Sequence, residues 1–229
     1  RNERGRVVDG PEWVAVWDGL TGKEIARAPW PSRAGFDSYN FASRHQLAVD
    51  YLDGRTPCLI VLRGTYRLMK VSAFALVGSQ LRPLWAFCNA NAPSKFVGQG
   101  AHFTQCVDVD ADGRDEVALG SMVLDDTGVP LWSTGKGHPD GLFVGDIDPL
   151  RPGLEVYCYV ETRNSTGGMI LVDAATGETL WELQTPTTHV HGGLCADLDP
   201  DFPGSECFGV DKRQVDRSEQ IVGSWLKTA

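Results

Sequence analysis

The chain has 229 residues, 42% of them hydrophobic, which suffices for one packed domain of the larger all-β kind. Its net charge of −9 argues against a nucleic-acid partner, because binding to phosphates requires a basic surface. No apolar run approaches the roughly 18 residues that a membrane helix needs, so we expect no membrane partner.

Two kinds of predicted turn alternate along the chain. Hairpin turns contain a glycine, which supplies a positive φ, beside an Asp or Thr that closes the turn with a side-chain hydrogen bond. Acidic turns place aspartates between two apolar strands. In chain order, the sequence predicts a hairpin at 16–25, acidic turns at 50–54 and 108–116, a hairpin at 123–132, an acidic turn at 146–155, a hairpin at 171–181 and an acidic turn at 197–206. The strands that follow the acidic turns are expected at 58–62, 116–119, 154–160 and 206–210.

The alternation of turns predicts an all-β fold, a β-propeller with four-stranded blades, because two hairpins in each period give four strands. About three whole blades fit the chain, with the end of one blade at 13–28 and the start of another at 189–210. A closed ring takes about four to eight blades. We therefore expect residues 1–229 to be part of a single propeller domain of a longer chain, with the remainder of the propeller on the same or another chain. The alternative is a small ring that residues 211–229 complete.

The acidic turns predict calcium sites. Asp108, Asp110 and Asp112 alternate along the turn before Gly113, as in the first half of a calcium loop. In the later copies, two aspartates precede a turn that returns a glutamate, and these three carboxylates can surround one cation. The predicted calcium ligands are Asp108, Asp110, Asp112, Asp115, Glu116, Asp146, Asp148, Glu155, Asp197, Asp199 and Glu206. The alternative is that these aspartates only cap their turns.

Histidines precede the acidic turns at a similar distance in each copy. His45, His102, His138, His189 and His191 lie five to eight residues ahead of the first aspartate of a turn. In a propeller, we expect these side chains to converge on one face beside the central axis. The six cysteines lie mostly in apolar strand patterns, which favours buried thiols over disulfides.

One segment carries a family resemblance. Residues 133–156, from Gly137-His138-Pro139-Asp140 to Pro152-Gly153-Leu154-Glu155, closely resemble the rhamnogalacturonan lyases of the eleventh polysaccharide lyase family, and so do residues 17–24 and 108–123. The resemblance implies an eight-bladed ring that holds several calcium ions. This chain would supply about three to four of the eight blades. Two segments, Phe36–Gln46 and Ala90–Gly100, match the family poorly.

The resemblance also implies a function. We expect a polysaccharide lyase that cleaves a rhamnose–uronate backbone by calcium-assisted β-elimination, with an acidic plant-type polysaccharide as its partner. His138 and Arg44 are the expected catalytic contributors, followed by Lys136. Exported bacterial enzymes of this kind imply a secreted, cell-surface or periplasmic location, and the first residue, Arg1, is consistent with a processed amino terminus.

Two other functions remain open at this point. A non-catalytic calcium-binding β-propeller that binds glycan or protein would show the same acidic turns. A quinoprotein-like propeller is the second alternative, because residues 173–181 resemble its blade motif. That motif is structural, however, and the sequence shows no cofactor residues beside it.

Overall fold

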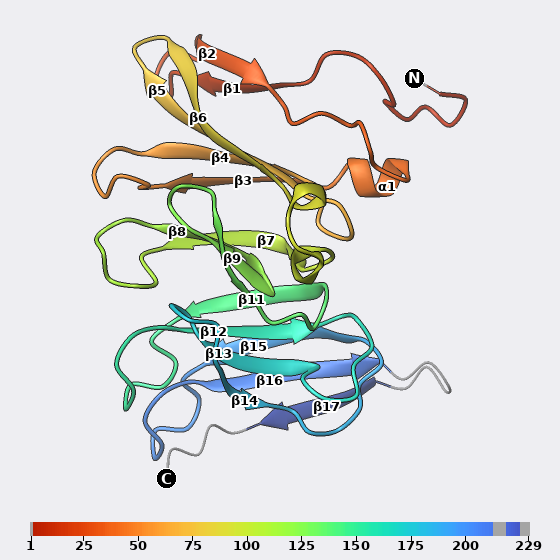
Figure 1. Cartoon of the computed structure of the whole chain (residues 1–229), viewed down its shortest axis with the longest axis vertical. Helices are drawn as coiled ribbons and strands as arrows, with labels where there is room; N and C mark the ends of the chain where they lie inside the picture. Colours follow the sequence, from red (N-terminus) through yellow and green to blue (C-terminus); the bar gives the residue numbers. More distant parts are fainter. Residues whose placement is uncertain (1, 213–218, 225–229) are drawn as a thin grey trace.

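The computed structural model describes residues 2–212 and 219–224, which form five antiparallel sheets stacked in chain order (Figure 1). The first sheet contains β1 (Trp13–Trp17) and β2 (Glu24–Pro29). The second contains β3 (His45–Asp50), β4 (Cys58–Arg63), β5 (Lys70–Val77) and β6 (Gln80–Cys88). The third contains β7 (Gly100–Val107), β8 (Glu116–Gly120), β9 (Met122–Leu124) and β10 (Pro130–Ser133).

The remaining two sheets continue the same order. The fourth contains β11 (Pro139–Gly145), β12 (Glu155–Val160), β13 (Met169–Asp173) and β14 (Thr179–Glu182). The fifth contains β15 (Val190–Ala196), β16 (Glu206–Lys212) and β17 (Glu219–Ser224). Short helices occupy two connections: α1 (Tyr39–Ala42), η1 (Asn89–Asn91) and η2 (Ser94–Phe96). None of the helices among the described residues is long and apolar enough to cross a membrane.

The second strand of a sheet packs on both neighbouring sheets. Side chains of a strand point alternately to its two faces. In β4, Ile60 and Leu62 therefore join the core shared with the third sheet, whereas Val61 joins the core shared with the first. In β12, Cys158 faces the third sheet and Tyr157 faces the fifth. Burial on both faces explains why these strands are continuous apolar runs.

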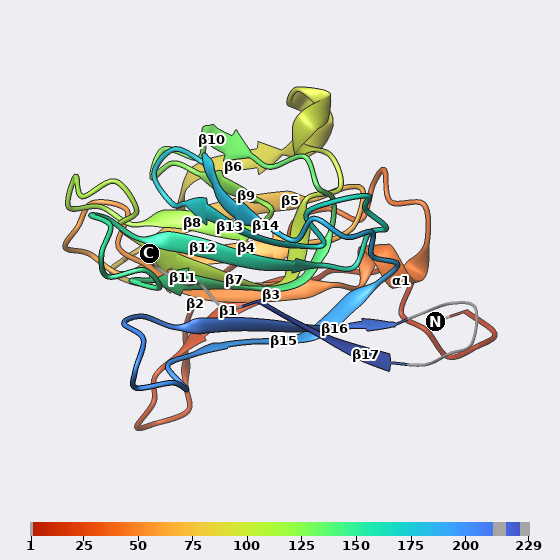
Figure 2. The ribbon, with the colours of Figure 1, turned by 90° about the horizontal axis from the view of Figure 1, so that it is seen from below.

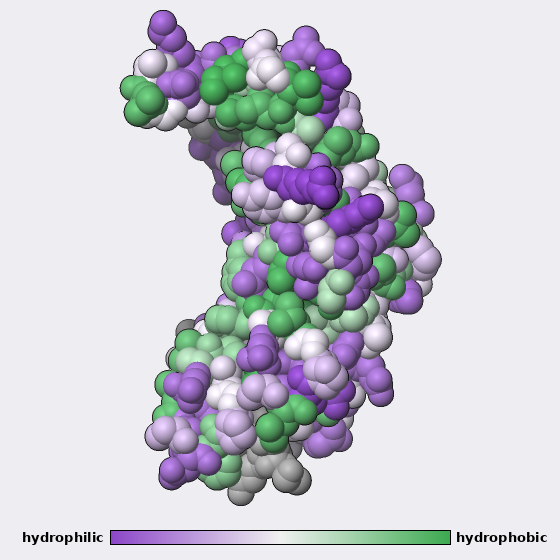
Figure 3. Space-filling model, turned by 90° about the vertical axis from the view of Figure 1, so that its left-hand side faces the viewer, coloured by the Kyte–Doolittle hydropathy of each residue, from purple (hydrophilic) through white to green (hydrophobic). Residues whose placement is uncertain are grey.

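The sheets are arranged as an arc. The first strands β3, β7, β11 and β15 lie against one another in turn. Seen from below, β3, β7 and β11 follow one side of the stack and β6 and β10 follow the other (Figure 2). The surface outline is a crescent (Figure 3). The described residues thus form an open arc, in which no ring is closed.

The structure confirms the all-β prediction and the period of four strands. Strands β4, β8, β12 and β16 begin within one residue of the predicted starts. Two-stranded and three-stranded sheets flank the four-stranded ones, as the partial blades predicted. The alternative of a small ring completed by residues 211–229 falls largely outside the described residues.

The predicted burial of the cysteines holds for three of them. Cys58, Cys158 and Cys207 are buried, and the other three are half-buried. Cys195 and Cys207 face each other across β15 and β16, with their Sγ atoms 3.7 Å apart.

Tryptophans on the last strand of two sheets form hydrogen bonds with a hairpin of the following sheet. Trp85, on β6, donates its indole N–H to the carbonyl of Asp126 at 2.7 Å. Trp132, on β10, donates in the same way to the carbonyl of Ala174 at 2.8 Å. The hairpin approaches so closely that a Cβ on Gly177, whose φ is +72°, would lie 2.6 Å from the Trp132 ring. Only glycine fits there, and the same holds for Gly128, where a Cβ would lie 2.6 Å from the Trp85 ring.

Replacing Trp132 by phenylalanine is expected to lower the free energy of unfolding by about 1–2 kcal/mol, because the buried Ala174 carbonyl loses its donor. Alanine at the same position should cost about 3–5 kcal/mol through the cavity it leaves. Chemical denaturation of the full-length protein measures both. Trp17→Phe is the control, because Trp17 is 59% exposed, and equal losses at the two positions would contradict the docking role.

Candidate functional site

A cluster of histidines and carboxylates lies where adjacent first strands begin. His102 is on β7, His138 directly precedes β11 and His189 directly precedes β15. Because β7, β11 and β15 pack side by side, their histidines meet around one acidic residue, Glu161, which directly follows β12. The ring of His191 lies 5.6 Å from that of His189.

The predicted convergence therefore holds for His102, His138 and His189, which meet at Glu161, while His191 is placed only beside His189. The fifth, His45, lies apart, with its ring 4.9 Å from that of Trp30.

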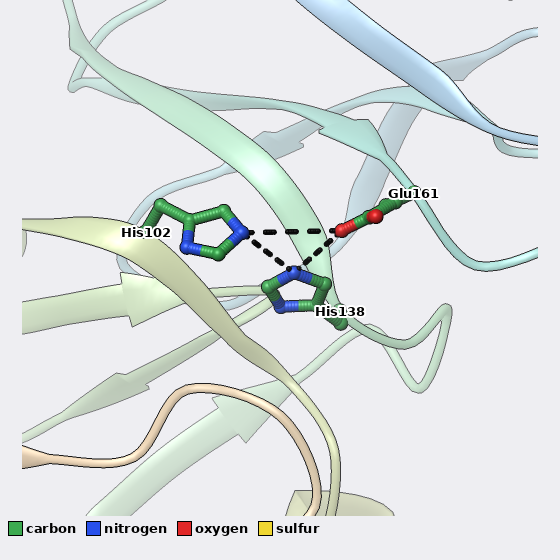
Figure 4. A group of neighbouring side chains, drawn as sticks. All are labelled: His102, His138 and Glu161. Carbon is green, nitrogen blue, oxygen red and sulfur yellow. Dashed lines mark hydrogen bonds and ion pairs between the residues drawn. The ribbon is translucent and has the colours of Figure 1, made fainter. Parts of the chain in front are cut away.

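The donor atoms of this cluster are close enough to share one ion. Glu161 Oε2 lies 2.8 Å from His138 Nε2 and 3.9 Å from His102 Nε2 (Figure 4). The two imidazole nitrogens are 3.3 Å apart. The other oxygen of Glu161 lies 3.3 Å from His189 Nε2, and Asp140 Oδ1 lies 3.7 Å from His102 Nε2. We call His102, His138, Asp140 and Glu161 the histidine–carboxylate centre.

The hydrogen bonding of His138 leaves a lone pair facing Glu161. Its Nδ1 contacts the carbonyl of Gly100. A carbonyl can only accept, so Nδ1 carries the hydrogen, and Nε2 of the neutral ring is an acceptor. Burial lowers the pKa of His138, although Gly100 and Glu161 act in the opposite direction. Two acceptors 2.8 Å apart then require a cation between them, either a proton or a metal ion.

The geometry of the centre fits a divalent metal. Donors about 2.1 Å from a tetrahedral ion are separated by about 3.4 Å, and the three separations among His102, His138 and Glu161 span 2.8–3.9 Å. The Gly100 carbonyl fixes the orientation of one ligand, as outer partners of metal-bound histidines do. Two nitrogens beside carboxylates suit a transition metal better than calcium, which prefers an all-oxygen set.

A pocket of about 400 Å³ opens beside the centre. Its lining residues are Tyr66, Arg67, Gly98, His138, Glu161, Thr162 and His189. The Tyr66 ring lies 4.5 Å from the His138 ring, and the Arg44 guanidinium carbon lies 5.5 Å from the Tyr66 ring centre. Burial raises the pKa of Tyr66, which keeps the phenol neutral. The structure thus places the predicted residues Arg44 and His138 around one tyrosine.

Lys136, the third predicted catalytic residue, points elsewhere. Its Nζ lies 2.6 Å from Glu182 Oε2 and 3.3 Å from the carbonyl of Thr166. The structure therefore places its ammonium group in an ion pair with Glu182.

At the opposite end of the first strands, one acidic turn brings three carboxylates together. Asp108, Asp110 and Glu116 each offer an oxygen, and these oxygens lie within 4.8 Å of one another. Glu116 is 1% exposed, and one of its oxygens has no hydrogen-bond partner. Burial, together with the neighbouring aspartates, raises the pKa of Glu116 to about 7. An oxygen cage with an unpaired buried oxygen fits a hard cation such as calcium.

All three predicted glutamates clamp their own turns. Glu116 accepts from one backbone N–H of its turn, that of Val109, at 2.9 Å. Glu155 accepts from two N–H groups, at 2.9 and 3.0 Å, and Glu206 from two, at 2.8 and 3.2 Å. These bonds occupy only Oε2 of each glutamate. The turns with Asp146 and Asp148, or with Asp197 and Asp199, bring their acids near this glutamate but form no three-carboxylate group among the described residues.

Two predicted ligands of the Asp108 turn, Asp112 and Asp115, lie outside the group of Asp108, Asp110 and Glu116, and like Asp108 they accept backbone N–H groups. Asp112 Oδ1 accepts from the N–H of Arg114 at 2.8 Å, and Asp115 Oδ2 accepts from the N–H of Tyr51 at 3.3 Å. Glu116 also belongs to a second group of three carboxylates, together with Asp125 and Asp126. These two aspartates were not predicted from the sequence. The sequence also gave no reason to select Asp140 and Glu161.

Fold and site together define an all-β protein of stacked antiparallel sheets, with a histidine–carboxylate centre at one end of the first strands and acidic turns at the other. Residues 1–227 match the family described as rhamnogalacturonan lyase family 11, C-terminal domain, and the chain belongs to this family.

The relatives are lyases from Bacillus. The chain is 42% identical over 215 residues to the rhamnogalacturonan endolyase YesW of Bacillus subtilis (strain 168), covering 91% of the chain and 34% of that protein. It is 38% identical over 219 residues to the exolyase YesX of the same organism, covering 92% and 36%. The chain thus spans about a third of the length of these curated relatives.

Solved structures agree with the sequence comparison. The crystal structure of YesW matches with a TM-score of 0.85 and 40% identity, covering 91% of the chain and 37% of that structure. The rhamnogalacturonan lyase of Bacillus licheniformis matches with a TM-score of 0.86 and 37% identity, with the same coverage of 91% and 37%.

Proposed function

We propose that this chain is part of a polysaccharide lyase that cleaves the rhamnose–uronate backbone of rhamnogalacturonan by β-elimination. The observation that carries the proposal is the histidine–carboxylate centre, which opens into a pocket beside Arg44 and Tyr66. Membership of a family of rhamnogalacturonan lyases supports the choice of substrate. Since such a polymer cannot cross a membrane, we also propose that the protein acts outside the cytoplasm.

We infer that the arc of sheets is about half of an eight-bladed β-propeller. The side-by-side first strands support this, because they would converge on a central axis when further sheets continue the curve. The loops at the histidine end of these strands would then surround the mouth of that axis, where propellers hold ligands. The remaining blades would complete the substrate groove.

Elimination from a uronate requires a group that neutralises the carboxylate, a base that removes the C5 proton, and a departing glycosidic oxygen. A divalent cation at the centre would supply the charge that stabilises the enolate-like state. His102, His138 and Glu161 would hold it, as their separations allow. Arg44, which stands over Tyr66, adds a second positive charge for the uronate.

We assign proton removal to His189. It lines the pocket and stays outside the three-residue group of His102, His138 and Glu161. Glu161 contacts its Nε2 at 3.3 Å, which orients the ring toward the pocket as a carboxylate orients a catalytic histidine. Lys136 remains a candidate only if substrate binding releases it from Glu182.

We further propose that calcium binds the acidic turns and has a structural role there. The converging oxygens of Asp108, Asp110 and Glu116 support this for the first of the turns. The repeated aspartates and glutamates of the turns at 146–155 and 197–206 support it for the other two.

Incubating the full-length protein with rhamnogalacturonan should generate unsaturated uronate, which is measured by its ultraviolet absorbance. A chelator should abolish the reaction, and added divalent cations should restore it, because the centre would lose and regain its ion. Polygalacturonate, which lacks rhamnose, is the matched control substrate. Retained binding of rhamnogalacturonan without unsaturated product would contradict the lyase and favour a non-catalytic glycan-binding propeller.

A further inference from the structure

A second, larger cavity of about 610 Å³ lies between three connections at the α1 end of the sheets. One wall is the segment before α1, with Asp37, and another is the segment around η1 and η2, with Val97. The β4–β5 connection supplies Arg67, and the first residue of β5 is Lys70. In Figure 1, α1 and the connection between β6 and β7 both lie toward the right-hand side of the stacked sheets. The volume lies within the range of small-molecule sites.

The cavity is lined by both apolar and polar residues. Leu68 and Val97 offer surface to the C–H faces of a sugar ring, while Asp37, Arg67 and Lys70 bring charge. The ammonium of Lys70 is already bound to the carbonyls of Ser32 and Ala34, at 3.1 and 2.7 Å. This leaves Arg67 as the cation that can bind a ligand.

Arg67 is held only weakly. Its one side-chain contact within residues 2–212 is with Asp37, where an N–H lies 3.2 Å from a carboxylate oxygen. The two side chains are 74% and 58% exposed, and ion pairs this exposed contribute little to stability. A guanidinium has five N–H donors in a planar fork that matches a carboxylate. A carboxylate from a ligand can therefore replace Asp37 at small cost.

Arg67 also lines the pocket beside the histidine–carboxylate centre, so it stands between the two cavities. We propose that the larger cavity is a second sugar subsite, in which Arg67 exchanges Asp37 for the carboxylate of a uronate. This rests on the proposed function and extends it: one polymer occupies both cavities, with a uronate at the centre and another at Arg67. Asp37 and Val97 lie in the two segments for which we expect a poor match to the family, so we expect this subsite to differ among its members.

The test compares long and short rhamnogalacturonan oligosaccharides as substrates of the full-length protein. Arg67→Gln should raise KM for long substrates about tenfold, the effect of one charge-assisted contact, while kcat stays within about twofold. KM for the shortest substrate that is cleaved should rise much less than KM for the long ones, because Arg67 also borders the pocket that the short substrate fills. Arg67→Lys keeps the charge without the fork and should recover part of the loss. Asp37→Asn removes the internal competitor and should lower KM by up to about fivefold.

Arg82→Gln is the matched control, because Arg82 is an exposed arginine on β6. An unchanged KM in Arg67→Gln, or an equal change for long and short substrates, would overturn the subsite. Calorimetric binding of a long oligosaccharide separates this from the proposed function. A protein without lyase activity whose affinity still falls about tenfold in Arg67→Gln would contradict the lyase and support the subsite.

Discussion

Replacing Glu161 by glutamine is expected to lower the rate of rhamnogalacturonan cleavage by about 100-fold or more. The carboxylate contacts His138 through one oxygen and His189 through the other. Glutamine keeps the volume but removes the negative charge, so the centre loses an ionic ligand and His189 loses its orienting partner. Steady-state kinetics on the full-length protein measure the rate, and titration with Mn²⁺ or Ca²⁺ measures the loss of metal affinity.

Glu178→Gln is the matched control for this change, because Glu178 is exposed on the β13–β14 hairpin. A histidine pair gives a second comparison. His138→Gln should lose activity to a similar degree, whereas His45→Gln should not, since the His45 ring packs against Trp30 and is in no contact with Glu161 among the described residues. Activity of Glu161→Gln within about twofold of the unsubstituted protein would remove Glu161 from the reaction.

Replacing Glu155 by alanine is expected to lower the free energy of unfolding by about 3 kcal/mol. Glu155 is 1% exposed, and its Oε2 accepts from the N–H groups of Ile147 and Asp148. Alanine leaves the buried N–H of Asp148 without its carboxylate acceptor, and leaves the N–H of Ile147 only the carbonyl of Gly145 at 3.0 Å. This loss is smaller than the free energy that two hydrogen bonds to a fully charged carboxylate would contribute. The reason is that burial raises the pKa of Glu155 and so disfavours its ionised form. Denaturant titration in the presence of a chelator measures this effect alone.

Glutamine at the same position separates the turn clamp from the calcium site. Its amide oxygen can still accept from the backbone, so Glu155→Gln without calcium should cost about 1 kcal/mol or less. A site that is filled at 100 times its dissociation constant stabilises by about 2.7 kcal/mol, and Glu155→Gln should lose this increment. Glu178→Ala serves as the control. If calcium stabilises Glu155→Gln as much as the unsubstituted protein, Glu155 is not a calcium ligand and only accepts the hydrogen bonds of its turn.

The order of sheets could be predicted from the sequence because each sheet repeats local signals. Glycines such as Gly177 mark hairpins by their backbone geometry, and apolar runs such as 154–160 mark strands buried on both faces. The glutamates at the starts of β12 and β16 recur with their turns. These features depend on residues close in sequence, so one chain suffices to recognise them.

The histidine–carboxylate centre could be predicted only in part. The histidines were visible because each precedes an acidic turn, but Glu161 is not repeated: Gly64 and Ser121 stand directly after β4 and β8, the counterparts of β12. Its role depends on the packing of β11 between β7 and β15, which no local pattern specifies. The ion pair of Lys136 could not be predicted from the sequence either, because its partner Glu182 lies 46 residues further along the chain.

The histidine–carboxylate centre draws its donors from successive sheets that adhere chiefly through side-chain packing. Within the centre, His102 belongs to the third sheet and Glu161 follows a strand of the fourth. His189, which contacts Glu161 from outside the centre, leads into the fifth. A bulkier residue in either interface would therefore displace these donors by roughly the added thickness. The affinity of the centre for a cation therefore depends on the distance between neighbouring sheets, so that packing between the sheets and metal binding at the centre are coupled.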